Sequence, residues 1–140
     1  MPFEVKLLSE LSAIEIRLWD RLTAEELRSA ASSVMESAER TGFRRALADC
    51  RDYLGGPGLG EVYFLTRDVT NRPASVRGPE AFVAPTDDYA RADVQFYVEA
   101  ARSLGTRAEL FPTREEAIEW LIATGHTGEP GPPADSSRSA

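Results

Sequence analysis

Residues 23–50 read TAEELRSAASSVMESAERTGFRRALADC and contain the signals of a helix followed by a strand. Thr23 and Glu26 have the spacing of a capping box, in which each side chain bonds an amide that the first helical turn leaves unpaired. Apolar residues then recur at helical spacing as far as Ala38, and Gly42 can adopt the left-handed conformation that ends a helix. RALADC, at 45–50, has the short apolar pattern of a strand. The stretch therefore predicts a helix that stops at Gly42 and a strand directly after it.

Two more strands are expected before this helix. FEVKLL, at 3–8, and AIEIRL, at 13–18, have short and partly alternating apolar patterns. The Ser-rich connection between them is short enough for an antiparallel hairpin. The chain is therefore expected to open with a pair of strands.

Helices and strands alternate after the third strand. The Gly-rich stretch LGGPGLG, at 54–60, should be a loop. Four elements are expected to follow: a short helix over 61–69, a strand over 81–85, a helix from Thr86 or Asp87 to Gly105, and a strand over 108–111. The long helix is expected to carry one apolar face formed by Tyr89, Ala92, Phe96, Ala100 and Leu104.

A last helix should begin at Thr113, because Glu116 repeats the capping-box spacing, and end near Gly125. Its buried stripe is expected to contain Ala117, Ile118, Leu121 and Ile122. The Gly/Pro/Ser-rich tail at 125–140 has no large apolar residue to offset the entropy of ordering it, and we expect it to be disordered. The folded domain should span residues 2–124.

This order of elements predicts an α/β fold. Strands that alternate with helices are joined by right-handed crossovers into a largely parallel sheet. We expect a five-stranded mixed sheet, with an antiparallel opening hairpin, a remainder that is mainly parallel, and about four helices.

Composition narrows the classes of function. The chain has 140 residues, of which 42% are apolar, and this favours one domain with a packed core. A net charge of -7 argues against nucleic acid and anionic lipid as partners. The N-terminus lacks the pattern of a signal peptide, and no apolar run is long enough for membrane insertion. We expect a cytoplasmic protein.

Catalytic groups are sparse. The sole histidine, His126, lies in the predicted tail, so neither a Cys–His pair, a Ser–His–Asp triad nor a metal site is expected. Cys50, the sole cysteine, is expected to be a small buried residue. Asp49 and Asp52 could act as paired carboxylates, although a strand-end turn explains them equally well. No cofactor is expected.

Several of these residues resemble a known family. The opening hairpin and the helix that ends at Gly105 are part of the resemblance, which spans almost the whole chain before the tail. The more local features are Leu47-Ala48-Asp49 at the end of the third strand, Phe111, Glu116-Ala117 and Trp120-Leu121. Together they resemble the SpoIIAA-like group, also called STAS/SEC14-type domains. The resemblance implies a STAS-like fold and a regulatory or ligand-binding role.

The antagonist lineage of that group carries a phosphoacceptor serine after the third strand, in a pattern like Asp-Ser-Ser-Gly-Leu-Gly. Here Gly58, Leu59 and Gly60 match that pattern, and the serine is absent. The resemblance therefore does not carry a phosphorylation switch to this place.

Ligands of open α/β sheets bind beyond the carboxyl ends of the strands, although a structural turn is the more common role of such a loop. The candidate residues for binding a ligand or partner are Asp49, Arg51, Asp52, Tyr53, Gly58, Gly60, Tyr63 and Arg67. The favoured function is a non-catalytic regulatory or protein-interaction module that binds a protein partner or forms a homodimer. A carrier of a small apolar or lipid-like ligand is the alternative, and a carboxylate-based enzyme ranks third.

Overall fold

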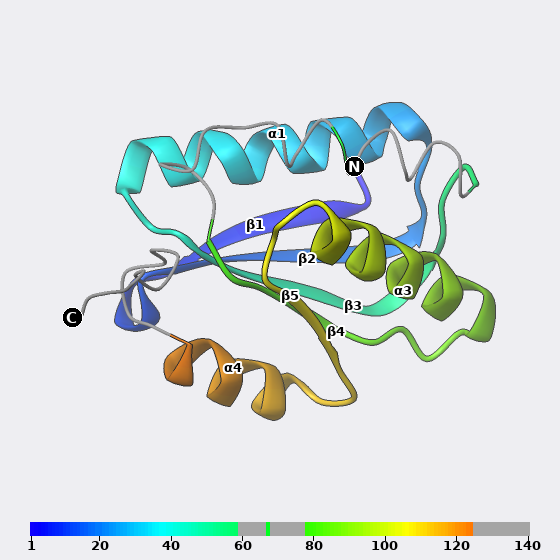
Figure 1. Ribbon diagram of the computed structural model, residues 1–140. Helices are drawn as coiled ribbons and strands as arrows, with labels where there is room; N and C mark the ends of the chain where they lie inside the picture. Colours follow the sequence, from blue (N-terminus) through cyan, green and yellow to red (C-terminus); the bar gives the residue numbers. More distant parts are fainter. Residues whose placement is uncertain (59–66, 68–77, 125–140) are drawn as a thin grey trace.

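The computed structural model describes residues 1–58, 67 and 78–124, and their elements form a single sheet with helices on both faces (Figure 1). The strands are β1 (Phe3–Leu8), β2 (Ala13–Arg21), β3 (Arg45–Gly55), β4 (Glu80–Val83) and β5 (Ala108–Phe111). The helices are α1 (Ala24–Thr41), α3 (Asp88–Ser103), α4 (Arg114–Ala123) and a 3-10 turn, η1 (Ser9–Leu11).

The sheet confirms the predicted mixed architecture. Its strand order is β1-β2-β3-β4-β5, in which β1 pairs with β2 antiparallel and the other neighbours pair parallel. The hairpin turns through η1 and Ser12, whose φ of 50° is left-handed. The tail at 125–140 and, apart from Arg67, the expected helix over 61–69 lie outside the described residues. Within the described residues the chain has three α-helices.

Local capping signals set the limits of α1 as predicted. The Thr23 hydroxyl accepts a hydrogen bond from the Glu26 amide at 3.1 Å, and the Glu26 carboxylate accepts one from the Thr23 amide at 2.9 Å. At the other end, Gly42 has a φ of 81°, and its amide donates to the Ala38 carbonyl at 2.9 Å. The two bonds between Thr23 and Glu26 satisfy amides that the start of a helix otherwise leaves unpaired.

The helices divide between the two sheet faces. α1 and α3 lie on one face and α4 on the other (Figure 1). Right-handed crossovers explain this division, because both β2–α1–β3 and β4–α3–β5 advance across the sheet in the same direction. α4 packs on β3, β4 and β5, and its cluster contains Leu47, Ala81, Val83, Ala117 and Leu121.

The prediction of which side of α3 is buried was wrong at both ends of the helix. Tyr89 is 56% exposed and Leu104 is 40% exposed, so neither is core. The buried side chains of α3 are Ala90, Asp93, Val94, Val98, Ala100 and Ala101. Asp93 lies in the middle of this face, and the predicted apolar face did not include it.

β3 is longer than the six residues predicted for it. It continues from Arg45 to Gly55, and its pairing with β2 shifts register, so that Arg17 faces Asp49 but Trp19 faces Asp52. A register shift of this kind changes which side chains point to which face. Beyond this shift, the polar end of β3 is still paired with β2.

Leu121 offers a test of the α4 packing. Its side chain is fully buried, so Leu121→Ala should lower the free energy of unfolding by about 2–5 kcal/mol. Ile122 is 55% exposed, and Ile122→Ala should therefore change stability by less than about 0.5 kcal/mol. Chemical denaturation measures both variants, and equal losses would contradict the orientation of α4.

Candidate functional site

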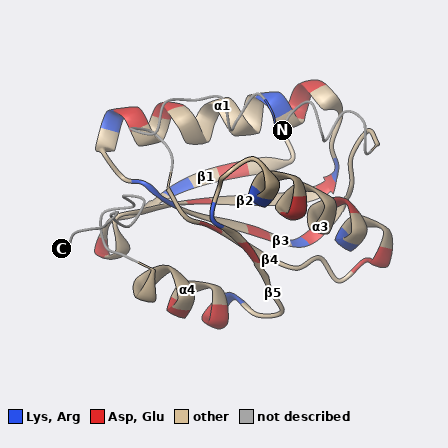
Figure 2. Ribbon diagram, viewed as in Figure 1, with Lys and Arg blue, Asp and Glu red and all other residues tan. Residues whose placement is uncertain are grey.

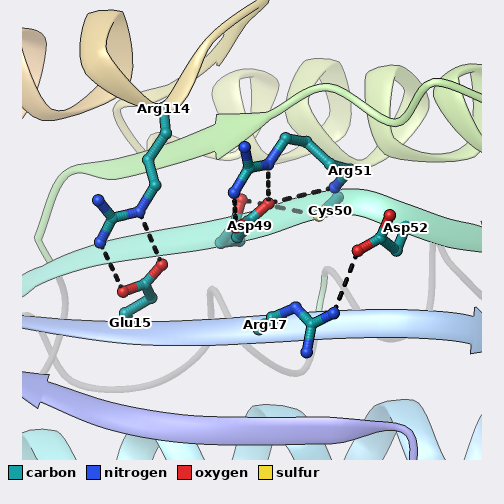
Figure 3. Close-up of polar contacts among 8 residues, drawn as sticks. Glu15, Arg17, Asp49, Cys50, Arg51, Asp52 and Arg114 are labelled. Carbon is teal, nitrogen blue, oxygen red and sulfur yellow. Dashed lines mark hydrogen bonds and ion pairs between the residues drawn. The ribbon is translucent and has the colours of Figure 1, made fainter.

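A cluster of charged side chains lies on the sheet face that carries α4 (Figure 3). Among the described residues, β2 from Arg17 onward is no longer fully buried, and Arg51 and Asp52 near the end of β3 are exposed. Alternate residues of a strand point to the same side, and the pairing of β2 with β3 places these side chains next to one another. Charged positions thus occur within the strands as well as along the helices (Figure 2). We call this cluster the charged face; it contains Glu15, Arg17, Trp19, Asp49, Arg51, Asp52 and Arg114.

Glu15 and Arg114 join β2 to the start of α4. The Arg114 guanidinium donates to both Glu15 carboxylate oxygens, at 2.8 Å and 3.1 Å. Glu15 is buried, and its ion pair compensates for the loss of water around its charge. The hydrogen bond with Glu15 raises the pKa of Arg114 above its ordinary value.

Asp49 and Arg51 form a second pair on β3 itself. The Arg51 guanidinium donates to the two Asp49 oxygens at 2.9 Å and 2.7 Å, and the Arg51 amide adds a bond of 3.3 Å. Burial alone would raise the pKa of Asp49, but the hydrogen bonds and charge of Arg51, with the charge of Arg114, hold it below its ordinary value. Asp49 is therefore a stably ionised carboxylate.

Arg17 and Asp52 form an exposed pair at the open side of the cluster. Their side chains are 47% and 64% exposed, and the Arg17 nitrogen lies 3.1 Å from the Asp52 oxygen. The Arg17 guanidinium also lies 4.9 Å from the centre of the Trp19 ring, in cation–π geometry. Exposed pairs contribute only about 0–1 kcal/mol to folding, so this one adds little to stability.

The arrangement does not favour carboxylate catalysis. A general acid needs a raised pKa, whereas that of Asp49 is lowered. Asp49 and Asp52 are also bonded to different arginines. Within residues 1–58, 67 and 78–124, no group of three or more His, Cys, Asp or Glu side chains could hold a metal ion.

The structure brings together three of the predicted site residues, Asp49, Arg51 and Asp52. Tyr53 instead points to the opposite face, where it is buried. Arg67 is exposed, and Gly58 has a left-handed φ of 134°. Gly60 and Tyr63 lie outside the described residues.

Sequence reasoning missed Glu15, Arg17 and Arg114 as members of the site. A signal was present for the first two, because they alternate with Ile14, Ile16 and Leu18 in β2 and so fall on one side of the strand. Arg114 gave no such signal. It meets Glu15 only because α4 starts over β2.

A second feature lies on the other face of the sheet, between α1, α3 and the strands. The described residues there line a partly open cavity of about 140 Å³, and most of the lining side chains are apolar. Cys50 lines it and is buried as predicted, and this burial raises the pKa of its thiol. The cavity and the charged face are therefore separated by the sheet.

The lowered pKa of Asp49 predicts the pH dependence of stability. A carboxylate whose pKa falls on folding stabilises the protein above the pKa of the unfolded chain, about 3.9, and loses this effect as the pH falls through the folded value. Asp49→Asn should cost about 1–2 kcal/mol at pH 7, and the difference from wild type should shrink below about pH 4. Thermal melts from pH 7 to pH 2 measure this change.

Asp88→Asn is the matched control for that experiment, because Asp88 also pairs with an arginine but its side chain is 93% exposed. Its melts should follow those of the wild type across the range. A constant difference between Asp49→Asn and wild type at every pH would contradict the proposed role of the Asp49 charge.

No family model matches the chain, and no curated protein is similar to it in sequence. Among residues 1–58, 67 and 78–124, none of the helices is both long and apolar enough to cross a membrane.

Two solved structures have similar folds. One is an uncharacterised protein of the DUF3478 family from Shewanella loihica with a SpoIIAA-like fold: the TM-score is 0.58 at 14% identity, over 85% of this chain and 93% of the other. The second is the anti-sigma factor antagonist SpoIIAA in its unphosphorylated form, with a TM-score of 0.54 at 17% identity, over 85% of this chain and 96% of the other. The chain therefore has a SpoIIAA-like fold, as the resemblance in its sequence predicted.

Proposed function

We propose that the chain is a non-catalytic interaction module that binds a protein partner through its charged face. The observation that carries this proposal is that Arg17 and Asp52 are exposed, and Trp19 is partly exposed beside them, on the same part of the sheet. Arginine and tryptophan are enriched among residues that dominate binding energy at protein interfaces.

The ion pairs hold these side chains in place before a partner arrives. Arg51 is fixed by Asp49, and Arg17 lies between Asp52 and the ring of Trp19. Ordering a long side chain on binding costs about 0.5–1.5 kcal/mol, and a side chain already held in place avoids part of that cost. Alternating charges also discriminate between partners, because like charges brought together by a wrong partner repel.

The similar structures supply a second line of support. SpoIIAA is an anti-sigma factor antagonist, and its fold extends over most of this chain. We propose by analogy that this chain also acts as a regulator through a protein partner, of which a second copy of itself is one form. Phosphorylation after β3 is not part of the proposal, because the serine is missing at the matching position.

Carriage of a small ligand is the second candidate function, and the cavity beneath α1 and α3 supports it. Its volume of about 140 Å³ is below the roughly 300–1,000 Å³ of typical sites for drug-sized ligands. A lipid-like ligand would need more space than this. The cavity therefore favours a much smaller molecule.

Arg17 offers a direct test of the charged face. Arg17→Ala should weaken binding to the partner at least tenfold, as expected for a central interface arginine, while the melting temperature changes little because the pair is exposed. Native mass spectrometry of the protein from its own host identifies a second copy or a bound protein, and biolayer interferometry then measures the affinity.

Arg91→Ala is the matched control, because Arg91 has a similar exposure and also pairs with an aspartate, but it lies on α3 at the other face. It should bind the partner as the wild type does. If the wild type, Arg17→Ala and Arg91→Ala bound the partner with equal affinity, the interface would lie elsewhere and the proposal would be overturned.

A further inference from the structure

The cavity on the face opposite the charged face has a definite chemical character. It forms because the residues that line it from α1 and the strands are small at several positions. These small residues are Ala30, Ala31, Ala46, Ala48 and Ala81. Larger apolar side chains, including Ile16, Val34 and Phe82, complete its walls. An apolar molecule would be well accommodated by such a lining.

Besides Glu80, Asp93 adds a carboxyl group to this otherwise mostly apolar lining. It projects from the buried face of α3, where it is only 4% exposed, and it lines the cavity. The Gly56 amide donates a hydrogen bond to its Oδ2 atom at 3.0 Å. A carboxylate has two oxygens and about four acceptor positions, so one amide leaves room for another donor. Burying a charged group is costly, and a second donor would reduce that cost.

We propose that this cavity binds a small molecule with an apolar body and one hydrogen-bond donor, an alcohol or a primary amine, whose donor group bonds to Asp93. The size of the ligand follows from the volume, because an engineered apolar cavity of about 150 Å³ in another protein binds benzene. The carboxylate sets the polarity: it accepts hydrogen bonds from hydroxyl and ammonium groups and repels anions. Carboxylic acids are therefore excluded.

This site is independent of the proposed partner interface. The two lie on opposite faces of the sheet, and Cys50 on the cavity side alternates with Asp49 and Arg51 on the other. A failure of ligand binding would leave the interface proposal intact, and the reverse also holds.

Three probes of similar shape test the proposal: benzylamine, benzyl alcohol and benzoate. Each is titrated into uniformly ¹⁵N-labelled protein, and the amide signal of Gly56 is followed because that amide bonds to Asp93. Benzylamine and benzyl alcohol should shift this signal and saturate, whereas benzoate should leave it unchanged. No saturable shift with either donor probe, or an equal response to benzoate, would overturn the proposal.

Asp93→Asn separates the charge from the shape of the site. Asparagine can still accept from the Gly56 amide through its carbonyl oxygen, so the fold should persist. The affinity for benzylamine should fall about tenfold or more, because a charge-assisted hydrogen bond is lost, and that for benzyl alcohol should fall less. Equal affinities for wild type and variant would show that the probes do not reach Asp93.

Two further measurements locate the probes without changing Asp93. Ala31→Leu should fill part of the cavity, abolish the saturable shifts and leave the melting temperature equal or higher. Cys50, the sole cysteine, lines the same cavity, so saturating benzyl alcohol should slow its reaction with methyl methanethiosulfonate. Unchanged probe binding in Ala31→Leu, a marked loss of its stability, or unprotected Cys50 would each contradict a ligand in this cavity.

Discussion

The parallel pairing of β2 with β3 organises the remainder of the fold. It requires a crossover between the strands, and α1, capped at both ends by its own sequence, spans that distance. The same pairing positions β3 in the middle of the sheet, where helices cover both faces. Its register shift after Arg17 then determines which polar side chains meet across the two strands.

The sheet consequently separates two environments. On the side of α4, Glu15 and Asp49 are buried carboxylates, and each is compensated by a bidentate arginine. Removing one member of such a pair leaves an uncompensated charge, so these pairs hold the base of the charged face in place. On the side of α1 and α3, the strands present mostly apolar residues, and carboxyl groups come from Asp93 on α3 and from Glu80 on β4. One sheet thus carries the charged face on one side and a mostly apolar cavity on the other.

Two differences between expectation and structure have the same physical origin. The predicted apolar face of α3 did not include Asp93, since a charged residue is ordinarily expected to face water. Asp93 is buried because Gly56, at the end of β3, supplies a donor. Arg114 was overlooked because its partner, Glu15, lies 99 residues away in sequence. In both cases the stabilising partner comes from an element that the local pattern does not contain.

The positions of the strands, the limits of α1 and the mixed topology follow from local signals, because capping bonds, left-handed glycines and apolar alternation act between residues a few positions apart. The sequence also indicated the polar end of β3, since Asp49, Arg51 and Asp52 follow one another there. Local patterns did not show which of these side chains share a face, that Tyr53 points away from them, or that β2 and α4 complete the cluster. Those outcomes depend on strand register and on helix placement, which arise from packing between distant segments.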